Sequence, residues 1–372
     1  MNQMARPIAL VVCLFLTELL VAQCKDPVSP PPKSPWALGP VNLIGILDGY
    51  YTLNNNEPGE GIAGLRAFDA RSGQPTLSMA KISLDAAPAP IGFHLEAGFG
   101  KAFDAIEAVA PRGGLDGWKQ IMQAYLSVKP KSWKGLQLDF GKFNTTVSAE
   151  LTDPMLNFNY SRSILFALSP YYHTGIRATM PVSKTLTAGA QLVEGWNGYD
   201  GKNHGVTVGL TSTWTPTQKV NWTNTLYSGP EDYFGARTYR NFFDSALAIS
   251  PTATTGIYVN VDYGQDERQL QKTARYYGAA VAGRYQWKPK IAFALRGESY
   301  RDAGGFWTGA ARTIGEVTVT AEYKQSRWLI SRLEYRRDMT NAPYFSMGRE
   351  NLPVGNQSTI SIGMIAYFGP AK

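Results

Sequence analysis

Cysteine is almost missing from this sequence. Of 372 residues only Cys13 and Cys24 are cysteines, and both lie near the N-terminus. The rest of the chain can therefore form no disulfide, and it holds no cysteine metal site or cysteine nucleophile. Histidine is also scarce, with His94, His173 and His204. Because these three are not spaced with carboxylates as metal ligands are, no metal site is predicted.

Long apolar runs are missing as well. Outside the N-terminal segment, no charge-free apolar run reaches the roughly 20 residues that cross a bilayer as a helix. This absence does not exclude a transmembrane β-barrel, because its strands need an apolar residue only at every second position. The formal net charge is +7, but the sequence has no basic helix and no RNA-binding motif. A nucleic-acid partner is therefore not predicted.

The first 40 residues differ from the rest in composition. Residues 1–24 have the basic start and apolar run of a secretory signal peptide. The sequence before Cys24 loosely resembles a lipoprotein signal, so lipidation of Cys24 stays open. Residues 25–40 are rich in proline and are predicted to form a periplasmic tether. Residues 41–372 are predicted to form a single outer-membrane domain.

The most regular pattern lies in residues 184–229. Apolar residues occupy every second position of 186–192 and 206–210, with small or polar residues between them. A period of two predicts strands rather than helices. The runs are about 11 residues long, which suits a tilted bilayer crossing, whereas soluble strands have about 5–6 residues. One connection is long and polar (196–202) and another is a tight turn (216–217), which is typical of a transmembrane β-barrel.

The same pattern continues along the chain and predicts sixteen strands. Their connections alternate between short and long, which predicts an all-β, antiparallel, up-and-down barrel with short periplasmic turns and long extracellular loops. Outward residues such as Val208 and Val319 are expected to contact lipid, and their neighbours Thr207 and Thr320 to contact water. The predicted strands are 41–53, 76–86, 91–101, 119–130, 134–144, 171–181, 184–195, 203–215, 218–229, 240–250, 253–264, 275–287, 290–301, 313–324, 327–338 and 357–368.

The two predicted ends of the barrel carry different side chains. Aromatic residues lie near both sets of connections, as expected for two girdles at the membrane interfaces. The short turns are also basic. They hold or adjoin Lys129, Lys131, Lys134, Lys184, Lys219, Lys288, Lys290, Lys324 and Arg327.

Several short motifs stand in a fixed order along the chain. They are residues 123–126 (QAYL), 141–143 (GKF), 159–163 (NYSRS), 170–177 (PYYHTGIR), 195–197 (GWN), 296–302 (RGESYRD) and 333–338 (LEYRRD). Together they resemble the β-barrel porin-2 family, the outer-membrane-porin-L-like group, from about residue 41 to residue 368. The resemblance implies a porin in the outer membrane of a Gram-negative-type bacterium. It names no solute.

The last predicted strand ends in an aromatic residue. Ile360, Ile362, Met364, Ala366 and Phe368 share one face of it. An aromatic-ended strand resembles the signal that the barrel assembly machinery reads. We therefore expect that machinery, together with outer-membrane lipid, to be a partner of this chain.

Alternation also predicts which charges face the lumen. Six basic and eight acidic residues nearly balance there, so the net charge of +7 does not predict anion selectivity. A charged inner wall favours a wet interior. The predicted lumen residues are Lys81, Arg177, Arg284, Arg296, Arg332 and Arg336, with Glu96, Asp139, Asp244, Asp262, Glu298, Glu316, Glu322 and Glu334, and also His94.

The longest connection, residues 145–170, is too apolar to extend into water. In general porins, which this chain resembles in strand count and loop order, the corresponding loop folds into the barrel. We expect the same here, with Glu150, Asp153 and Arg162 facing a basic wall of Arg296, Arg332 and Arg336 across a constriction. The alternative is an outward loop that packs on its neighbours or on another subunit.

Three functions fit this pattern. The favoured one is passive diffusion of small hydrophilic solutes through a water-filled lumen, because sixteen strands enclose an aqueous channel unless something fills it. The second is a structural or adhesive barrel with a plugged lumen. The third is an outer-membrane hydrolase using His94 or His173, which is disfavoured because no nucleophile motif accompanies them. No enzyme and no cofactor are predicted, and a homotrimer is compatible with the size of the chain.

Overall fold

The structure is a computed structural model of the chain, described here for residues 37–38, 40–108, 116–198, 205–233, 236–268 and 273–369. The predicted signal peptide and Cys24 lie outside the described residues, as does His204.

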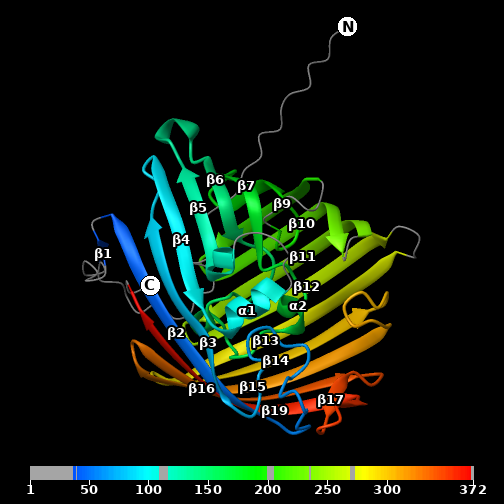
Figure 1. The fold of residues 1–372 in the computed structure, drawn as a ribbon. Helices are drawn as coiled ribbons and strands as arrows, with labels where there is room; N and C mark the ends of the chain where they lie inside the picture. Colours follow the sequence, from blue (N-terminus) through cyan, green and yellow to red (C-terminus); the bar gives the residue numbers. More distant parts are fainter. Residues whose placement is uncertain are drawn as a thin grey trace.

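The described residues form a closed antiparallel barrel of sixteen strands (Figure 1). Each strand pairs with the one before it, and β19 closes the ring by pairing with β2, for example Ile362 with Tyr51. The barrel strands are β2 (Val41–Asn54), β3 (Pro75–Ala86), β4 (Ile91–Phe99), β5 (Ile121–Val128), β6 (Gln137–Asn144), β7 (Tyr172–Pro181), β8 (Leu186–Val193), β9 (Thr207–Thr217), β10 (Val220–Tyr233), β11 (Ala236–Thr252), β12 (Thr255–Arg268), β13 (Ala274–Lys288), β14 (Ile291–Asp302), β15 (Arg312–Ser326), β16 (Leu329–Thr340) and β19 (Asn356–Phe368).

All sixteen predicted strands are present, and the predicted fold class is confirmed. At their long-loop ends, β10, β11 and β12 each extend four residues beyond the prediction, to Tyr233, Ala236 and Arg268. Two strands start late because the chain makes a tight turn before them. Residues 134–136 were predicted to begin β6, but Lys134 has a left-handed backbone (φ 52°) after the short helix η2 (Lys131–Trp133). β5 begins two residues later than predicted, because η1 (Asp116–Gln120) precedes it. Alternation alone carries no information about such turns.

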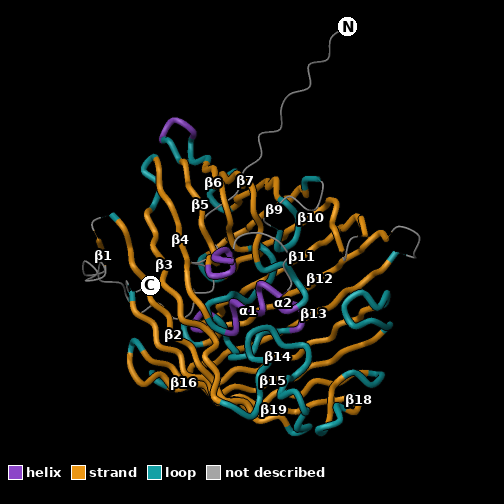
Figure 2. The backbone as a smooth tube through the Cα atoms, in the orientation of Figure 1, coloured by secondary structure: helices purple, strands orange, loops and turns teal. Residues whose placement is uncertain are grey.

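Further short elements lie at the ends of the barrel and inside it. β1 (Ala37–Leu38) pairs with β2, and β17 (Phe345–Met347) pairs with β18 (Leu352–Val354) in a separate hairpin. The helices α1 (Lys101–Ala108) and α2 (Ile164–Ala167) lie within the ring of strands (Figure 2). A third 3-10 helix, η3, covers Pro154–Leu156. No helix in the described ranges is both long and apolar enough to span a membrane.

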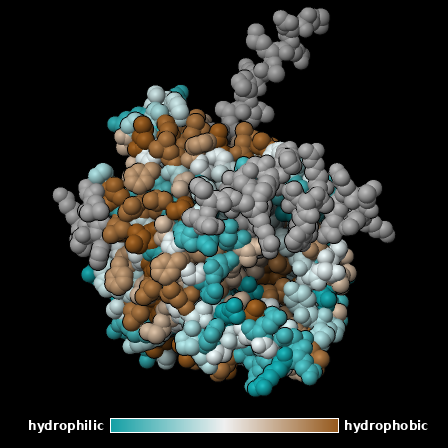
Figure 3. Space-filling model, viewed as in Figure 1, coloured by the Kyte–Doolittle hydropathy of each residue, from teal (hydrophilic) through white to brown (hydrophobic). Residues whose placement is uncertain are grey.

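The outer face of the barrel is apolar. In the space-filling view, apolar side chains gather over β3, β4 and β5 (Figure 3). Val208 and Val319 are exposed on this face, as alternation predicts. Their inward neighbours differ from expectation: Thr207 is 2% exposed and Thr320 is fully buried, so neither has much contact with bulk water. The physical reason is that the long loops fill much of the interior.

An arginine in place of Val319 should destabilise the barrel strongly. Val319 stands midway along β15 and is 48% exposed on the lipid-facing side. Near mid-bilayer such a charge costs about 2–4 kcal/mol, and near an interface about 0–1 kcal/mol. Val182, exposed at the turn after β7, offers the matched control Val182→Arg. Urea unfolding of both variants in lipid vesicles measures the difference, and equal losses would contradict this depth assignment.

Candidate functional site

The connection between β6 and β7, residues 145–171, lies inside the barrel and contacts its wall in many places. Near its start, the backbone N–H of Ala149 donates to Asn260 of β12 at 2.6 Å. Midway, the Tyr160 hydroxyl donates to Asp48 of β2 at 2.9 Å. Near its end, the Ser169 hydroxyl donates to Asp262 of β12. The loop therefore crosses the lumen and returns, and we call residues 145–171 the internal loop.

Two buried glutamates on the wall hold the backbone of the internal loop. Glu334 of β16 accepts hydrogen bonds from the N–H groups of Tyr160 and Ser161, at 2.6 and 2.9 Å. Glu298 of β14 accepts from Ile164 and Leu165, at 2.7 and 2.6 Å. A carboxylate that accepts backbone N–H bonds in a buried site makes charge-assisted bonds, which are about twice as strong as neutral ones. These two side chains satisfy N–H groups that strand pairing cannot reach.

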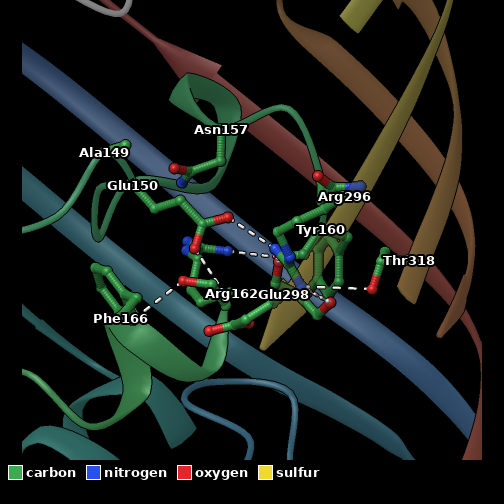
Figure 4. Close-up of polar contacts among 12 residues, drawn as sticks. Ala149, Glu150, Asn157, Tyr160, Arg162, Phe166, Arg296, Glu298 and Thr318 are labelled. Carbon is green, nitrogen blue, oxygen red and sulfur yellow. Dashed lines mark hydrogen bonds and ion pairs between the residues drawn. The ribbon is translucent and has the colours of Figure 1, made fainter. Parts of the chain in front are cut away.

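Three wall arginines bind the carbonyl groups of the same loop. Arg332 donates to the carbonyl oxygens of residues 154, 157 and 159, and Arg336 to that of residue 162. Arg296 donates to the Ser161 carbonyl and forms an ion pair with Glu150, both at 2.7 Å (Figure 4). The planar guanidinium presents several donors at once, which suits an irregular backbone.

The acidic and basic walls that the sequence predicts are in contact rather than opposed across water. Glu150, Arg162, Arg296, Arg332 and Arg336 are all at most 3% exposed. The difference arises because the arginines are long enough to reach the loop itself. Asp153 differs from these five: its side chain is 17% exposed, and it pairs with Lys81 of β3 at 2.5 Å.

Apolar side chains of the internal loop fit against glycines in the wall. A Cβ atom on Gly363 of β19 would lie 2.3 Å from the Tyr160 ring, and one on Gly256 of β12 would lie 2.8 Å from Phe158. A Cβ on Gly278 of β13 would lie 2.7 Å from the Tyr300 ring of the wall and 3.1 Å from Leu165 of the loop. These glycines act as sockets, because any larger residue would occupy the space that the loop side chain fills.

Gly363→Ala should loosen the internal loop. The new methyl group must displace the Tyr160 ring, which strains its bond to Asp48, and overpacking of this kind costs about 1–3 kcal/mol. Gly297 of β14 is the control, because a Cβ there meets nothing within 4 Å. Limited proteolysis of the internal loop and urea unfolding both measure the effect. If Gly363→Ala and Gly297→Ala behave alike, the socket does not hold the loop.

The other predicted lumen residues lie inside the barrel in local charge pairs. Lys81 pairs with Glu96 at 2.8 Å, Arg177 with Asp139 at 2.8 Å, and Arg284 with Glu322 at 2.6 Å. Arg296 contacts Glu316, and Asn260 donates to both Asp244 and Asp262. His94 lies between Asp85 and Glu96. Lys81–Glu96 and Arg177–Asp139 join neighbouring strands, and Arg284–Glu322 reaches from β13 across β14 to β15, so these charges also stabilise the wall.

Comparison with known proteins places this arrangement in a family. The model of the family described as "Putative beta-barrel porin-2, OmpL-like" matches residues 40–368. The chain belongs to this family. The porin has a closed sixteen-stranded barrel of the outer-membrane type, so its location is the outer membrane of a Gram-negative bacterium. No protein of curated function matches the sequence.

Solved structures share the fold of the porin at low sequence identity. The anion-selective porin from Comamonas acidovorans is 10% identical with a TM-score of 0.61, covering 88% of this chain and 99% of that one. Outer-membrane-expressed OmpT of Vibrio cholerae is 15% identical with a TM-score of 0.59, covering 88% and 97%. The outer-membrane channel DcaP of Acinetobacter baumannii is 11% identical with a TM-score of 0.58, covering 88% and 96%.

The two described histidines of the porin have no serine partner. The His94 nitrogens contact Asp85 at 3.0 Å and Glu96 at 3.1 Å. His173 contacts the Gly195 carbonyl at 2.8 Å and the Thr145 hydroxyl at 3.2 Å. A serine hydrolase needs its base within hydrogen-bond reach of the nucleophile. Within the described ranges, no group of three His, Cys, Asp or Glu residues could hold a metal ion.

Sequence reasoning missed a second loop inside the porin. Residues 55–74, between β2 and β3, bring Phe68 against Phe166 of the internal loop, with ring centroids 5.7 Å apart. Arg66 in the same loop pairs with Asp338 of β16 at 3.1 Å. The apolar residues 65, 67 and 68 beside that arginine were the available signal, because an apolar run in a long loop needs a surface to cover it.

Acid should release the internal loop only well below neutral pH. Burial alone would raise the pKa of Glu150, but Arg296 and the N–H of Ser163 outweigh it and hold the pKa below its ordinary value. A lowered pKa means that ionised Glu150 stabilises the docked loop above the ordinary value, about 4.3, and that this contribution is lost as pH falls through the lower folded value.

We therefore expect the conductance of the porin to stay constant from pH 7 down to about 4 and to rise in stronger acid. Single-channel recording across this range measures the effect. Glu150→Gln is the control, because it cannot titrate and should lack the part of the rise that Glu150 causes. A wild-type rise centred above about pH 5 would contradict the lowered pKa.

Proposed function

We propose that the porin passes small hydrophilic solutes by passive diffusion, along the polar wall that the internal loop leaves free. The observation that carries this proposal is the way the loop is held. Its backbone is fixed to the wall by Glu298, Glu334 and three arginines. A loop fixed at so many points narrows a lumen to a constant width, whereas a mobile loop would open and close it.

In this proposal the charges that meet solutes are the partly exposed ones. Asp153 lies on the side of the internal loop that faces Lys81, and Asp85, whose side chain is 42% exposed, lies beside His94. The five buried candidates, Glu150, Arg162, Arg296, Arg332 and Arg336, hold the loop and thus set the width of the constriction indirectly. We infer that Asp153 contributes most to selectivity, because a charge in a narrow, poorly screened passage acts strongly on passing ions.

Planar-bilayer recording tests this function directly. The purified chain should give discrete conductance steps, and Asp153→Asn should shift the reversal potential in a salt gradient toward anions. Arg301→Gln, a cation-to-neutral change on the outer side of β14, should leave the reversal potential unchanged. A correctly folded chain without steps would contradict the diffusion proposal.

A plugged barrel with a structural or adhesive role is the second candidate. The observation that favours it is the complete burial of Arg296 and Arg336 at the level of the internal loop. The same bilayer recording separates the two proposals, because a plugged barrel would be silent. For the third candidate, a hydrolase, esterase and phospholipase assays on the wild-type chain should give no activity above a chain with His94 and His173 replaced by glutamine.

We also propose three partners that follow from the fold. Phe368, exposed at the end of β19, is the residue that barrel assembly machinery would read. The apolar outer face would contact outer-membrane lipid. A homotrimer is supported by one similar structure, OmpT of Vibrio cholerae, which is described in a trimer form at 14% identity and a TM-score of 0.55. Analytical ultracentrifugation in detergent tests the oligomeric state.

A further inference from the structure

The two ends of the barrel differ sharply in charge. The seven short connections between barrel strands hold no aspartate or glutamate. They and the strand ends beside them hold nine cations, more than the net charge of +7 for the whole chain, and one exposed carboxylate, Asp85 at the end of β3. The rest of the chain is therefore slightly acidic. We call these nine residues, Lys129, Lys131, Lys134, Lys184, Lys219, Lys288, Lys290, Lys324 and Arg327, the basic rim.

The basic rim is available to a partner. Eight of its nine side chains are exposed, and Lys129 is half-buried. In the part of the chain that the structure describes, none of the nine forms an ion pair, although the lumen is full of them. Because no acidic side chain of the described protein neutralises these cations, their charge can attract an anionic partner outside the protein.

Four of these cations are brought together on two adjacent turns. Lys288 ends β13 and Lys290 lies on the turn that follows it. Lys324 lies near the end of β15, and Arg327 lies on the turn that follows that strand. The backbone N–H of Lys324 donates to the Lys290 carbonyl at 2.8 Å, which fixes the two turns side by side. The Lys290 ammonium reaches the Gln325 carbonyl on the second turn. We call these four residues the β13–β16 patch.

Two cations of the β13–β16 patch, Lys288 and Arg327, lie against aromatic rings at the outer side of the rim. The Lys288 ammonium lies 4.3 Å from the ring centre of Trp287, which is 53% exposed on the outer face. The Arg327 guanidinium lies 4.3 Å from the ring centre of Trp328, which stacks on Phe368. Tryptophan in such a girdle marks the headgroup level of a membrane. Lys288 and Arg327 are therefore at the depth of lipid phosphates.

We propose that the β13–β16 patch binds the phosphate groups of anionic phospholipids in the periplasmic leaflet. The apolar stems of lysine and arginine lie along the aromatic girdle while their charged heads reach the headgroups. Each cation near an anionic membrane surface attracts it independently, so four together give a clear preference. The acceptor on the lipid side is a headgroup with net negative charge, as in phosphatidylglycerol.

Quenching of tryptophan fluorescence by brominated lipid tests this proposal on the full chain in vesicles. Trp287 and Trp328 report on the lipid beside the patch. The relative affinity for brominated phosphatidylglycerol over brominated phosphatidylcholine should fall at least about tenfold in the variant Lys288→Gln, Lys290→Gln, Lys324→Gln, Arg327→Gln. The wild-type preference should also weaken at about 0.5 M salt, because the Debye length shortens.

The matched control removes the same charge at the opposite end of the barrel. Lys101, Arg275, Arg337 and Arg349 are exposed near the long loops, and replacing all four with glutamine should leave the preference unchanged. An unchanged preference in the patch variant, or an equal loss in both variants, would overturn the proposal. So would displacement of phosphatidylglycerol by an equal concentration of inorganic phosphate, since a free anion would then be the ligand.

Two further measurements keep the test decisive. If the fourfold variant does not fold, Lys288→Gln and Arg327→Gln are measured singly and should each lower the preference several-fold. If the patch variant changes the ion selectivity of the channel and leaves the lipid preference intact, the cations steer solutes instead, and the lipid proposal is wrong.

Discussion

Deleting residues 150–162 should raise the single-channel conductance of the porin several-fold. These residues lie across the lumen of a barrel whose sixteen strands would otherwise enclose an aqueous channel. The deletion is sterically feasible, because the Ser163 N–H bonds to Glu150 at 2.6 Å, so a short glycine–serine linker can join residues 149 and 163. The wall should stay closed, since every strand keeps both of its neighbours.

The control is a deletion of loop residues at the extracellular surface. Residues 347–353 form the tip of the β17–β18 hairpin, which contacts the loop of residues 55–74 through hydrogen bonds of Gly348 and Asn351 to residues 56 and 59. Their removal should leave the conductance close to that of the wild type. If the internal-loop deletion changes the conductance no more than the hairpin deletion does, residues 150–162 do not form the constriction.

Arg296→Met should be the most destabilising single substitution in the lumen. Arg296 is fully buried and pairs with both Glu150 of the internal loop, at 2.7 Å, and Glu316 of β15, at 3.0 Å. Removing it leaves Glu150 without its ion-pair partner and leaves Glu316 with only the more distant Arg336, at 3.8 Å. Breaking a buried ion pair in this way costs about 3–5 kcal/mol, because the remaining charge is neither solvated nor paired.

Arg301→Met supplies the comparison within the same strand. Arg301 lies on the outer side of β14, and its guanidinium donates to the Thr313 hydroxyl at 2.8 Å. Its replacement should change the unfolding free energy by no more than about 0.5 kcal/mol. Urea unfolding in vesicles measures both variants. Similar losses would mean that the buried network contributes no more than a surface contact, and the role assigned to Arg296 would fail.

Sequence alone could predict the barrel because one rule repeats along the chain. A strand in a barrel wall has lipid on one side and the interior on the other, so each residue reports its side by its polarity. Val208 can be assigned to the lipid side and Thr207 to the interior without knowing which distant residues they contact. The same locality explains the errors at β5 and β6, where a 3-10 turn depends on local backbone geometry that alternation does not encode.

The internal site could be predicted only in outline. Apolar residues such as Phe158 and Leu165 in the longest loop indicated that it packs on something. Which wall groups it meets depends on register across the whole barrel. Glu334, for example, accepts hydrogen bonds from Tyr160 and Ser161, which lie 174 and 173 positions before it in the chain. The sequence showed balanced lumen charges, but it could not show that the arginines bind loop carbonyls instead of facing water.

Tyr160 has a consequence for the order in which the barrel is assembled. It contacts Asp48 of β2, Glu334 of β16 and the Gly363 socket of β19, and β2 and β19 are the first and last strands of the ring. One interior residue thus joins the two edges that must meet at closure. We therefore expect insertion of the loop to add side-chain contacts to a seam that the backbone pairing of β2 with β19 already closes.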